Sequence, residues 1–427
     1  MNIATLPRYD SYKDSGVQWI GEIPSHWLVE RSKWLFHDRK ERARKGEPQL
    51  AATQKYGVIP QAEFMELEGR RITQVFLDFT ILKHVEAGDF VMSMRSFQGG
   101  LEYSEHTGCV SSAYVALEPQ DEVHPPFYKY LLKSTRYIEA LQSTSNLVRD
   151  GQALRFENFS MVDLFAPPLP EQRAIAAFLD GKCATIDEAV RIKEEQITLL
   201  RERRQILIQQ AVTRGLNKDA PMKDSGIDWI GQIPAHWEPR HNKFIFALTK
   251  RLVGKRAPEF DLLSLTLRGV IKRDMENPEG KFPAEFDTYQ EVTPGDFVFC
   301  HFDVEETPRT IGLSEFFGMI TGAYTVYRPA EDVNSRFLMH FYIFADTGKK
   351  MRGMYKGLRN TIPKESFASF KTPLPPRDEQ DAIVAHIDDQ SRRIDAAIAL
   401  KESQITALRE YKTSLINAAV TGKIKVM

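Results

Sequence analysis

The sequence predicts an α+β protein with two α/β domains separated by two long helices that form an antiparallel coiled coil, related as a pseudo-twofold internal repeat. Two duplications in the 427-residue chain support this fold class. "KDSGVQWIGEIPSHW" at 13–27 returns as "KDSGIDWIGQIPAHW" at 223–237, and a helical block at 171–216 returns at 379–424. A long-period duplication marks structural units. The order Trp-rich segment, variable domain, Pro-rich hinge and long helix therefore occurs twice.

Composition narrows the class of protein. The chain is too long for one ordinary core, and 42% hydrophobic with 27% charged residues describes a soluble globular protein. No apolar run of membrane-spanning length and no signal peptide are visible, so a cytoplasmic location is expected. Cys109, Cys183 and Cys300 have no CxxC spacing, which predicts neither disulfides nor a metal site. Because the net charge is −1, nucleic-acid binding would have to rest on local patches.

The Trp-rich segment is expected to be a packing element. Its apolar residues can form a small cluster of Trp19, Ile20, Ile23 and Trp27. His26 and His236 recur in the two copies, but neither has a second metal-binding side chain nearby in sequence. We therefore expect a structural role for both histidines.

The variable regions that follow should mix strands and helices. Apolar runs at 76–82 and 89–94 are strand candidates, with "AGD" supplying the turn between them. Helical spacing of apolar residues begins at Phe127 in the first region and at Arg336 in the second.

The two long helices carry matching heptad patterns. Both seams are mostly apolar and are interrupted by cations at equivalent places, which is typical of a coiled coil whose polar positions set register or orientation. The predicted seam residues are Ile186, Val190, Lys193, Ile197, Leu200, Arg204 and Leu207 in the first helix and Ile394, Ile398, Lys401, Ile405, Leu408, Lys412 and Leu415 in the second. The alternative is that each helix lies separately on its own domain.

Helix length suggests what such a pair could do. A helix of about 30 residues spans roughly 45 Å. An antiparallel pair would carry the variable domains at opposite ends, whereas a parallel pair would place them side by side. A spacing of this order is comparable with one turn of duplex DNA, about 34 to 36 Å.

Catalytic motifs are not visible in the sequence. We find no GxxxxGK[ST], HExxH or GxSxG, and no ligand spacing among the 10 histidines. "HPPFY" at 124–128 faintly resembles the NPPF-type site of amino-methyltransferases, but it is better explained as a Pro-stiffened helix start. "DRK" at 38–40 lacks the acidic partner of a nuclease site and is expected to lie on a solvated face.

Basic patches in the variable regions are the better functional candidates. Lys and Arg can neutralise phosphates, and Arg, Asn or Gln can read base edges. The candidate DNA-binding residues are Arg31, Lys33, Arg39, Lys40, Arg95, Gln98, Arg149 and Gln152 in the first region and Lys250, Arg251, Lys255, Arg256, Arg352, Lys356, Arg359 and Asn360 in the second. For any single residue, a surface charge without a partner is the competing explanation.

The duplicated motifs closely resemble the specificity subunit of type I restriction-modification enzymes. The resemblance covers nearly the whole chain through the Trp-rich segment, "GDFV", "SxAY", "GLRNTI", "PLPPxxEQ" and the heptad helix. It implies target recognition domains at 1–165 and 217–372, and conserved spacer helices at 166–216 and 373–427. One departure is that the first copy has "VRDGQALRF" where the second has "KGLRNTI".

The resemblance also implies a function. In that family each target recognition domain reads one half of a bipartite, gapped double-stranded DNA site, and the helices dock two methyltransferase subunits, with restriction subunits in the full complex. The specificity subunit has no catalytic centre and no cofactor of its own, and AdoMet, ATP and Mg²⁺ are implied for its partners. Two alternatives remain open: a protein-interaction scaffold without DNA specificity, and an autonomous DNA enzyme.

Overall fold

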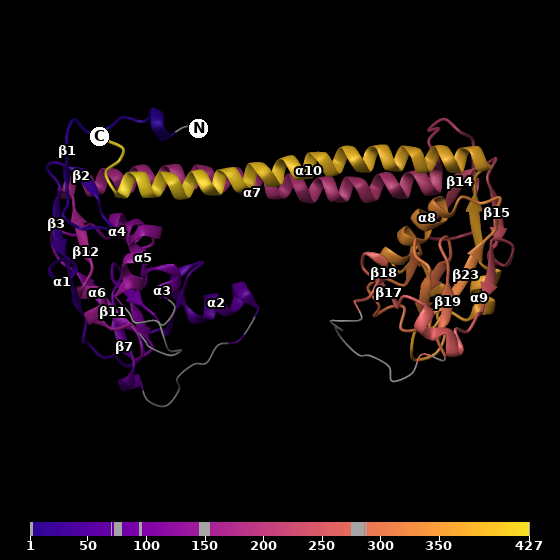
Figure 1. Cartoon of the computed structure of the whole chain (residues 1–427), viewed down its shortest axis with the longest axis horizontal. Helices are drawn as coiled ribbons and strands as arrows, with labels where there is room; N and C mark the ends of the chain where they lie inside the picture. Colours follow the sequence, from indigo (N-terminus) through magenta and orange to yellow (C-terminus); the bar gives the residue numbers. More distant parts are fainter. Residues whose placement is uncertain are drawn as a thin grey trace. The chain divides into compact units, whose positions relative to one another are not determined.

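The structure is a computed structural model that describes residues 3–69, 71, 79–93, 96–144, 154–274, 286 and 288–426 (Figure 1). The chain divides into two compact units. The first comprises Met1–Lys193 with Glu402–Met427, and the second comprises Glu194–Lys401. Each unit therefore holds one α/β domain and a part of both long helices, whereas the boundaries expected from the sequence assign each helix to a separate segment.

The first unit contains many short elements before its long helix. Its strands are β1 (Tyr12–Asp14), β2 (Glu22–Pro24), β3 (Leu28–Arg31), β4 (Phe36–Asp38), β5 (Leu50–Thr53), β6 (Gly57–Pro60), β7 (Lys83–Val85), β8 (Phe90–Met92), β9 (Glu102–Tyr103), β10 (Gly108–Val110), β11 (Val115–Pro119) and β12 (Asp163–Ala166). Its helices are η1 (Ile3–Thr5), α1 (Ser32–Leu35), α2 (Gln61–Glu68), η2 (Phe79–Ile81), α3 (Ser96–Gly99), α4 (Pro125–Leu131), α5 (Thr135–Ser143), α6 (Phe156–Ser160) and the start of α7 (Leu169–Arg214).

The second unit repeats this order. Its strands are β13 (Met222–Asp224), β14 (Gln232–Pro234), β15 (Glu238–His241), β16 (Phe246–Thr249), β17 (Leu263–Thr266), β18 (Gly269–Lys272), β19 (Gln290–Val292), β20 (Phe297–Phe299), β21 (Ile311–Leu313), β22 (Gly318–Ile320), β23 (Thr325–Pro329) and β24 (Lys371–Leu374). Its helices are η3 (Asn242–Phe244), η4 (Gly254–Glu259), α8 (Ser335–Thr347), η5 (Lys350–Met354), α9 (Lys364–Ser369) and the start of α10 (Arg377–Val420).

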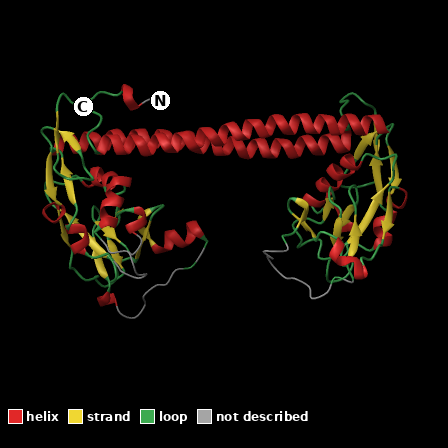
Figure 2. Cartoon of the chain, in the orientation of Figure 1, coloured by secondary structure: helices red, strands yellow, loops and turns green. Residues whose placement is uncertain are grey.

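The sheets of the two units correspond one to one. Figure 2 shows that each unit combines strands, in yellow, with helices, in red. A four-stranded antiparallel sheet has the order β4-β11-β8-β9 in the first unit and β16-β23-β20-β21 in the second. The two-stranded sheets β1-β2, β3-β12, β5-β6 and β7-β10 match β13-β14, β15-β24, β17-β18 and β19-β22. The α+β class and the internal repeat are thus confirmed at the level of strand pairing.

The Trp-rich segments are packing elements, as predicted. Trp27 and Trp237 are fully buried, and each belongs to the main core of its own unit. In the first unit the segment also packs on the end of α10, because a Cβ at Gly422 would lie 3.1 Å from the Trp27 ring. Gly422 has φ +70°, which favours glycine. The segment therefore joins its domain to the long helices.

Two element predictions need correction. Of the strand expected at 76–82, residues 76–78 lie outside the described residues, 79–81 form the 3-10 helix η2, and the strand β7 begins at Lys83. The helix expected from Phe127 is two helices, α4 and α5, because the Ser134 Oγ accepts a hydrogen bond from the Tyr137 N–H and starts a new helix. The helix expected from Arg336 is present as α8, and Asn334 caps it.

The long helices pair in an antiparallel coiled coil. In the first unit, the Lys412 Nζ of α10 lies 2.6 Å from Asp187 Oδ2 of α7, and the Lys193 Nζ donates to Gln404 Oε1 at 2.8 Å. A later residue of α7 therefore contacts an earlier residue of α10, which means that the two helices run antiparallel. In the second unit the Arg204 Nη1 donates to Asp395 Oδ1 at 2.7 Å. The alternative of helices lying separately on their own domains is excluded.

The apolar seam residues are mostly buried. The seam residues that are less than 10% exposed are Ile186, Val190, Ile197, Ile394, Ile398, Ile405 and Leu415, while Leu200, Leu207 and Leu408 are half-buried. The seam cations Lys193, Arg204 and Lys412 reach polar partners on the other helix, which is how such residues fix register. Among the described helices, none has a stretch long and apolar enough to span a bilayer.

Candidate nucleic-acid interface

Two hydrogen-bonded loops in the second domain carry Arg359 and Asn360 of "GLRN", which were predicted to contact DNA. The first loop follows β20 and the second follows η5. Backbone N–H groups of Asp303 and Ile362 donate to the carbonyl oxygens of Arg359 and His301, at 2.7 Å and 2.8 Å. Two further backbone bonds join Lys356 and Thr361, at 2.8 Å and 3.0 Å. The two loops therefore form one unit, which we call the paired loops (301–307 and 355–362).

The predicted contact residues Lys356 and Arg359 are exposed on the second loop, Asn360 is half-buried there, and Arg352 is exposed on η5 just before it. Three of these four residues have partners. The Arg359 Nε donates to Asp303 Oδ1 at 2.9 Å, and its Nη2 contacts the other oxygen. The Arg352 Nε donates to Glu305 Oε2 at 2.9 Å, and its Nη2 contacts Oε1. The Asn360 Nδ2 donates to Glu306 Oε1 at 2.9 Å. One short acidic segment thus faces the base-reading candidates.

These contacts stabilise the charged forms of both partners. The hydrogen bond from Arg359 lowers the pKa of Asp303, and that from Arg352 lowers the pKa of Glu305. In return, the carboxylates raise the pKa of both guanidinium groups. This acidic segment was not among the predicted site residues, although "DVEET" between an apolar strand and a proline indicates a charged loop.

The other basic stretch of the second domain lies on separate elements. Arg251 lies 3.7 Å from Glu291, and Arg256 pairs with Glu259 at 3.2 Å while its guanidinium lies over the Phe260 ring. Lys250 and Lys255 are exposed. This stretch remains a candidate for phosphate contacts.

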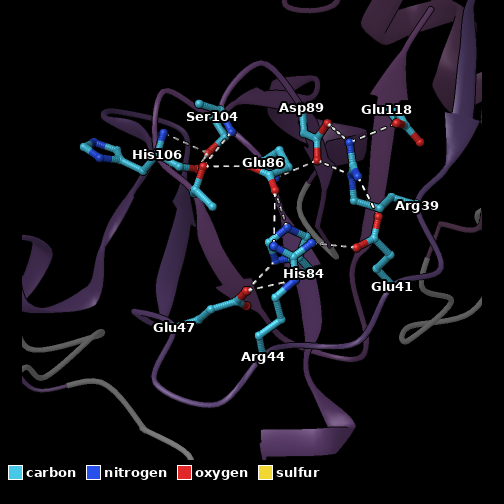
Figure 3. Close-up of polar contacts among 12 residues, drawn as sticks. Arg39, Glu41, Arg44, Glu47, His84, Glu86, Asp89, Ser104, His106 and Glu118 are labelled. Carbon is cyan, nitrogen blue, oxygen red and sulfur yellow. Dashed lines mark hydrogen bonds and ion pairs between the residues drawn. The ribbon is translucent and has the colours of Figure 1, made fainter.

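In the first domain the candidates at 31–40 separate into surface and interior residues. Lys33 and Lys40 are exposed, and Arg31 lies 3.8 Å from Asp163 on the neighbouring strand. Arg39 is different, because its side chain is only 10% exposed and is enclosed by the carboxylates of Asp89, Glu41 and Glu118 (Figure 3). A guanidinium held in this way is a structural cation rather than a surface charge. The expectation of a solvated face at 38–40 is therefore wrong for Arg39.

The buried aspartate of "GDFV" explains why Arg39 points inward. Asp89 is 1% exposed, and burial raises its pKa while Arg39 acts in the opposite direction. The equivalent Asp296 is also 1% exposed, and there the Arg328 Nε lies 2.6 Å from Oδ1. Arg328 stands on β23, whereas Arg39 follows β4. The repeat-related aspartates Asp89 and Asp296 therefore each pair with one arginine, but the two arginines come from different strands of the sheet.

Three first-domain candidates cannot be placed. Arg95, Arg149 and Gln152 lie outside the described residues, and Gln98 is exposed on α3. The structure consequently brings together Arg352, Lys356, Arg359 and Asn360 in the second domain, but it assembles no equivalent group from the described residues of the first.

The recurrent histidines have a structural role, and their partner was not anticipated. In the first unit, the Trp27 Nε1 donates to Glu171 Oε2 at 3.1 Å, and the His26 Nε2 lies 2.8 Å from the same oxygen. In the second, Trp237 and His236 contact Glu379 at 3.1 Å and 2.7 Å. The glutamate of "EQ" thus anchors the Trp-rich segment to the first turn of the helix.

The neighbouring glutamine holds the domain at the same point. Gln172 Oε1 accepts a hydrogen bond from the His124 N–H before α4, and Gln380 Oε1 accepts one from the Asn334 N–H before α8. The motif "PLPxxEQ" is therefore a structural joint. Within the described ranges, no group of His, Cys, Asp and Glu side chains has the arrangement of a metal site.

Comparison with known proteins agrees with this architecture. No family model matches the chain. The protein named as the type I restriction enzyme MjaX specificity subunit of Methanocaldococcus jannaschii is 21% identical over 437 residues, covering 95% of this chain and 96% of the relative.

Two solved structures share the fold. A chain from a type I R-M system, described for its complex assembly and conformational transition, has a TM-score of 0.64 at 13% identity, covering 93% of this chain and 98% of that one. The HsdS subunit from Thermoanaerobacter tengcongensis has a TM-score of 0.54 at 14% identity, covering 94% and 98%.

The duplicated domains and the antiparallel helix pair define the class: a tandem-repeat α+β protein whose two halves share one strand order. Sequence similarity to a type I restriction enzyme specificity subunit extends along almost the whole chain. The chain is a relative of the specificity subunits of type I restriction-modification systems, and the resemblance found in its motifs is confirmed.

Proposed function

We propose that this chain is the DNA-recognition subunit of a type I restriction-modification complex and that each α/β domain reads one half of a gapped duplex site. The observation that supports the proposal is the contrast between conserved joints and divergent loops within one chain. Glu171 and Glu379 each contact the Trp and His side chains of the Trp-rich segment in their own copy, whereas the "GLRN" sequence of the second domain has no match in the first. Two joints with matching contacts suit the docking of two copies of one partner subunit. Two loops that differ in sequence suit the reading of two different half-sites.

Partner subunits would supply the chemistry. The proposed partners are two methyltransferase subunits docked on the helices, with restriction subunits joining through them. AdoMet, ATP and Mg²⁺ would act in those subunits, in the cytoplasm. The exposed cations Lys33, Lys40, Lys250 and Lys255 would contact phosphates, which gives affinity without sequence choice.

The decisive experiment is assembly of the chain with its cognate methyltransferase subunit, followed by binding to gapped duplexes chosen from a map of methylated adenines in the source genome. Preference for one bipartite site supports the proposal. Binding without sequence preference, or salt-independent failure to bind DNA, would favour a protein scaffold. Methyl transfer by the isolated chain would favour an autonomous enzyme.

The helices can be tested separately. Adding one heptad to both α7 and α10 should change or abolish the tolerated gap while leaving both half-site preferences as they were, because the loops that read bases are unaltered. A change in the half-site preferences would mean that the helices themselves read the bases.

A further inference from the structure

The acidic segment of the paired loops contains Asp303, Glu305 and Glu306, and each of these carboxylates contacts a different base-reading candidate. We propose that these three acidic residues position the readout side chains of the second domain and oppose non-specific binding to phosphates. The inference rests on the proposed function, because it assumes that Arg352, Arg359 and Asn360 read DNA.

The geometry of the ion pairs leaves part of each guanidinium group free. A guanidinium has five N–H donors in a planar fork. Asp303 engages Arg359 through Nε and Nη2, and Glu305 engages Arg352 through the same two atoms. The Nη1 atom of each arginine keeps its donors. Each arginine is therefore fixed in orientation by its carboxylate while it still presents an edge that can donate to a base.

Asn360 is held in a similar way. One N–H of its amide donates to Glu306, which leaves the Oδ1 acceptor and a second N–H. One acceptor beside one donor is what an asparagine uses to bind adenine through N6 and N7. The carboxylate thus orients the amide without occupying the atoms that recognition needs.

The backbone around these residues is held in place. Asp303, Lys349 and Asn360 are the non-glycine residues with positive φ in the described part of the chain, at 46°, 46° and 43°. Such conformations cost energy and persist where the surroundings impose them. Lys349 donates through Nζ to the Thr307 carbonyl at 2.6 Å and to Asp346 at 2.8 Å, which ties the end of the acidic segment to α8.

The position of Leu358 shows which part of the loop faces outward. Leu358 is fully exposed at the tip of the second loop, between Gly357 and Arg359. Gly357 has φ +70°, so the tip is a tight turn that favours glycine. Asp303 stands beside Arg359, which adjoins this tip, and Glu305 stands beside Arg352 on η5. A phosphate group approaching either guanidinium would meet a like charge, whereas a neutral base edge would not.

The test compares the complex of wild-type chain and methyltransferase subunits with complexes carrying Asp303→Asn, Glu305→Gln, Glu306→Gln and all three substitutions. Dissociation constants would be measured for the cognate gapped duplex and for duplexes scrambled in either half-site, at one salt concentration. The triple variant should bind the duplex scrambled in the second half-site roughly 10-fold more tightly and lose roughly 10-fold in discrimination there. Discrimination at the first half-site should not change.

A matched control is Glu315→Gln, which removes one exposed carboxylate from the β21–β22 loop of the same domain. If it loosens discrimination as much as the three single variants, the effect is one of net charge and the inference fails. Equal weakening of cognate and scrambled binding in the triple variant would show a merely structural role and would also overturn it. A wild-type complex that does not discriminate at all would instead overturn the proposed function.

Discussion

Lys412 of α10 and Asp187 of α7 form an ion pair across the helix seam of the first unit, with Nζ 2.6 Å from Oδ2. The repeat-related pair is Arg204 and Asp395, at 2.7 Å in the second unit. In both pairs the aspartate is about 60% exposed and the cation 30%. Equivalent positions thus make the same contact in each unit. The antiparallel register is therefore specified by one ion pair in each of the two units.

Charge reversal at the Lys412–Asp187 ion pair should test whether this pair helps to set the helix register. Lys412→Asp places two carboxylates together in the first unit, and we expect it to lower the free energy of unfolding by about 1 kcal/mol, the scale of an exposed pair. Combining it with Asp187→Lys should recover most of that loss. The measurement is a double-mutant cycle by chemical denaturation. Absence of coupling between the two substitutions would show that the apolar seam alone sets the register.

The glutamate of "EQ" should be more important in the first unit than in the second. The Glu171 side chain is 5% exposed and contacts Tyr9, His26 and Trp27, whereas the Glu379 side chain is 25% exposed. Glu171→Ala leaves the buried Trp27 Nε1–H unpaired, so we expect a loss of about 2 kcal/mol in the stability of the first unit. Calorimetry should show a lower transition temperature for that unit, and Glu379→Ala should cause a smaller shift in the second. Equal shifts would contradict this ranking.

Local patterns in the sequence were sufficient to predict the framework. The heptads around Ile186 and Ile394 predicted paired helices, and the polar seam residues predicted a device that fixes register, because both signals come from residues a few positions apart. The burial of Trp27 was predictable for the same reason. Strand pairing could not be read in this way, since β7 and β10 lie far apart in the chain.

The candidate interface was predicted less well, because a basic residue looks the same in sequence whether its partner is a phosphate or a buried carboxylate. Arg39 stands in a run of cations, and its partner Asp89 is fifty positions away. Arg359 matched a family motif, but Asp303, which holds it, lies in another loop. Only the fold brings these partners together.

Arg39 offers a direct test of structural against DNA-binding roles. Arg39→Thr leaves the carboxylate of Asp89 buried without its cation, and we expect a loss of about 3 kcal/mol in the stability of the first unit. In the second unit, Thr249 occupies the position of Arg39 and Arg328 occupies the position of Glu118. Adding Glu118→Arg to Arg39→Thr copies that arrangement and should restore most of the stability. Thermal unfolding of both variants measures this, and DNA affinity of the rescued complex should equal that of the wild type. A rescued fold with weakened DNA binding would instead make Arg39 a phosphate contact.

His301 should make the stability of the second unit dependent on pH. The side chain is buried against Phe299 and Phe367, and desolvation lowers the pKa of His301 from 6.5 to about 4, with a smaller effect of Lys364. Between these two values the unfolded chain binds a proton that the folded chain rejects. Stability therefore falls as the pH drops from about 6.5 to about 4, by about 3 kcal/mol over the full window.

Replacing His301 with phenylalanine keeps an aromatic ring and removes the titrating group. The difference in transition temperature between His301→Phe and wild type should increase in favour of the variant as the pH is lowered from 7 to 4.5, and titrating carboxylates elsewhere cancel in that difference.

His84 is the contrasting control. Its ring nitrogens lie 2.8 Å from Glu47 and Glu86, and their hydrogen bonds outweigh burial and raise the pKa of His84. The stabilisation from His84 is fully present below pH 6.5 and is lost as the pH rises through its folded pKa, so His84→Gln should be most damaging at low pH. A parallel pH response of the two variants would contradict the opposite environments of these histidines.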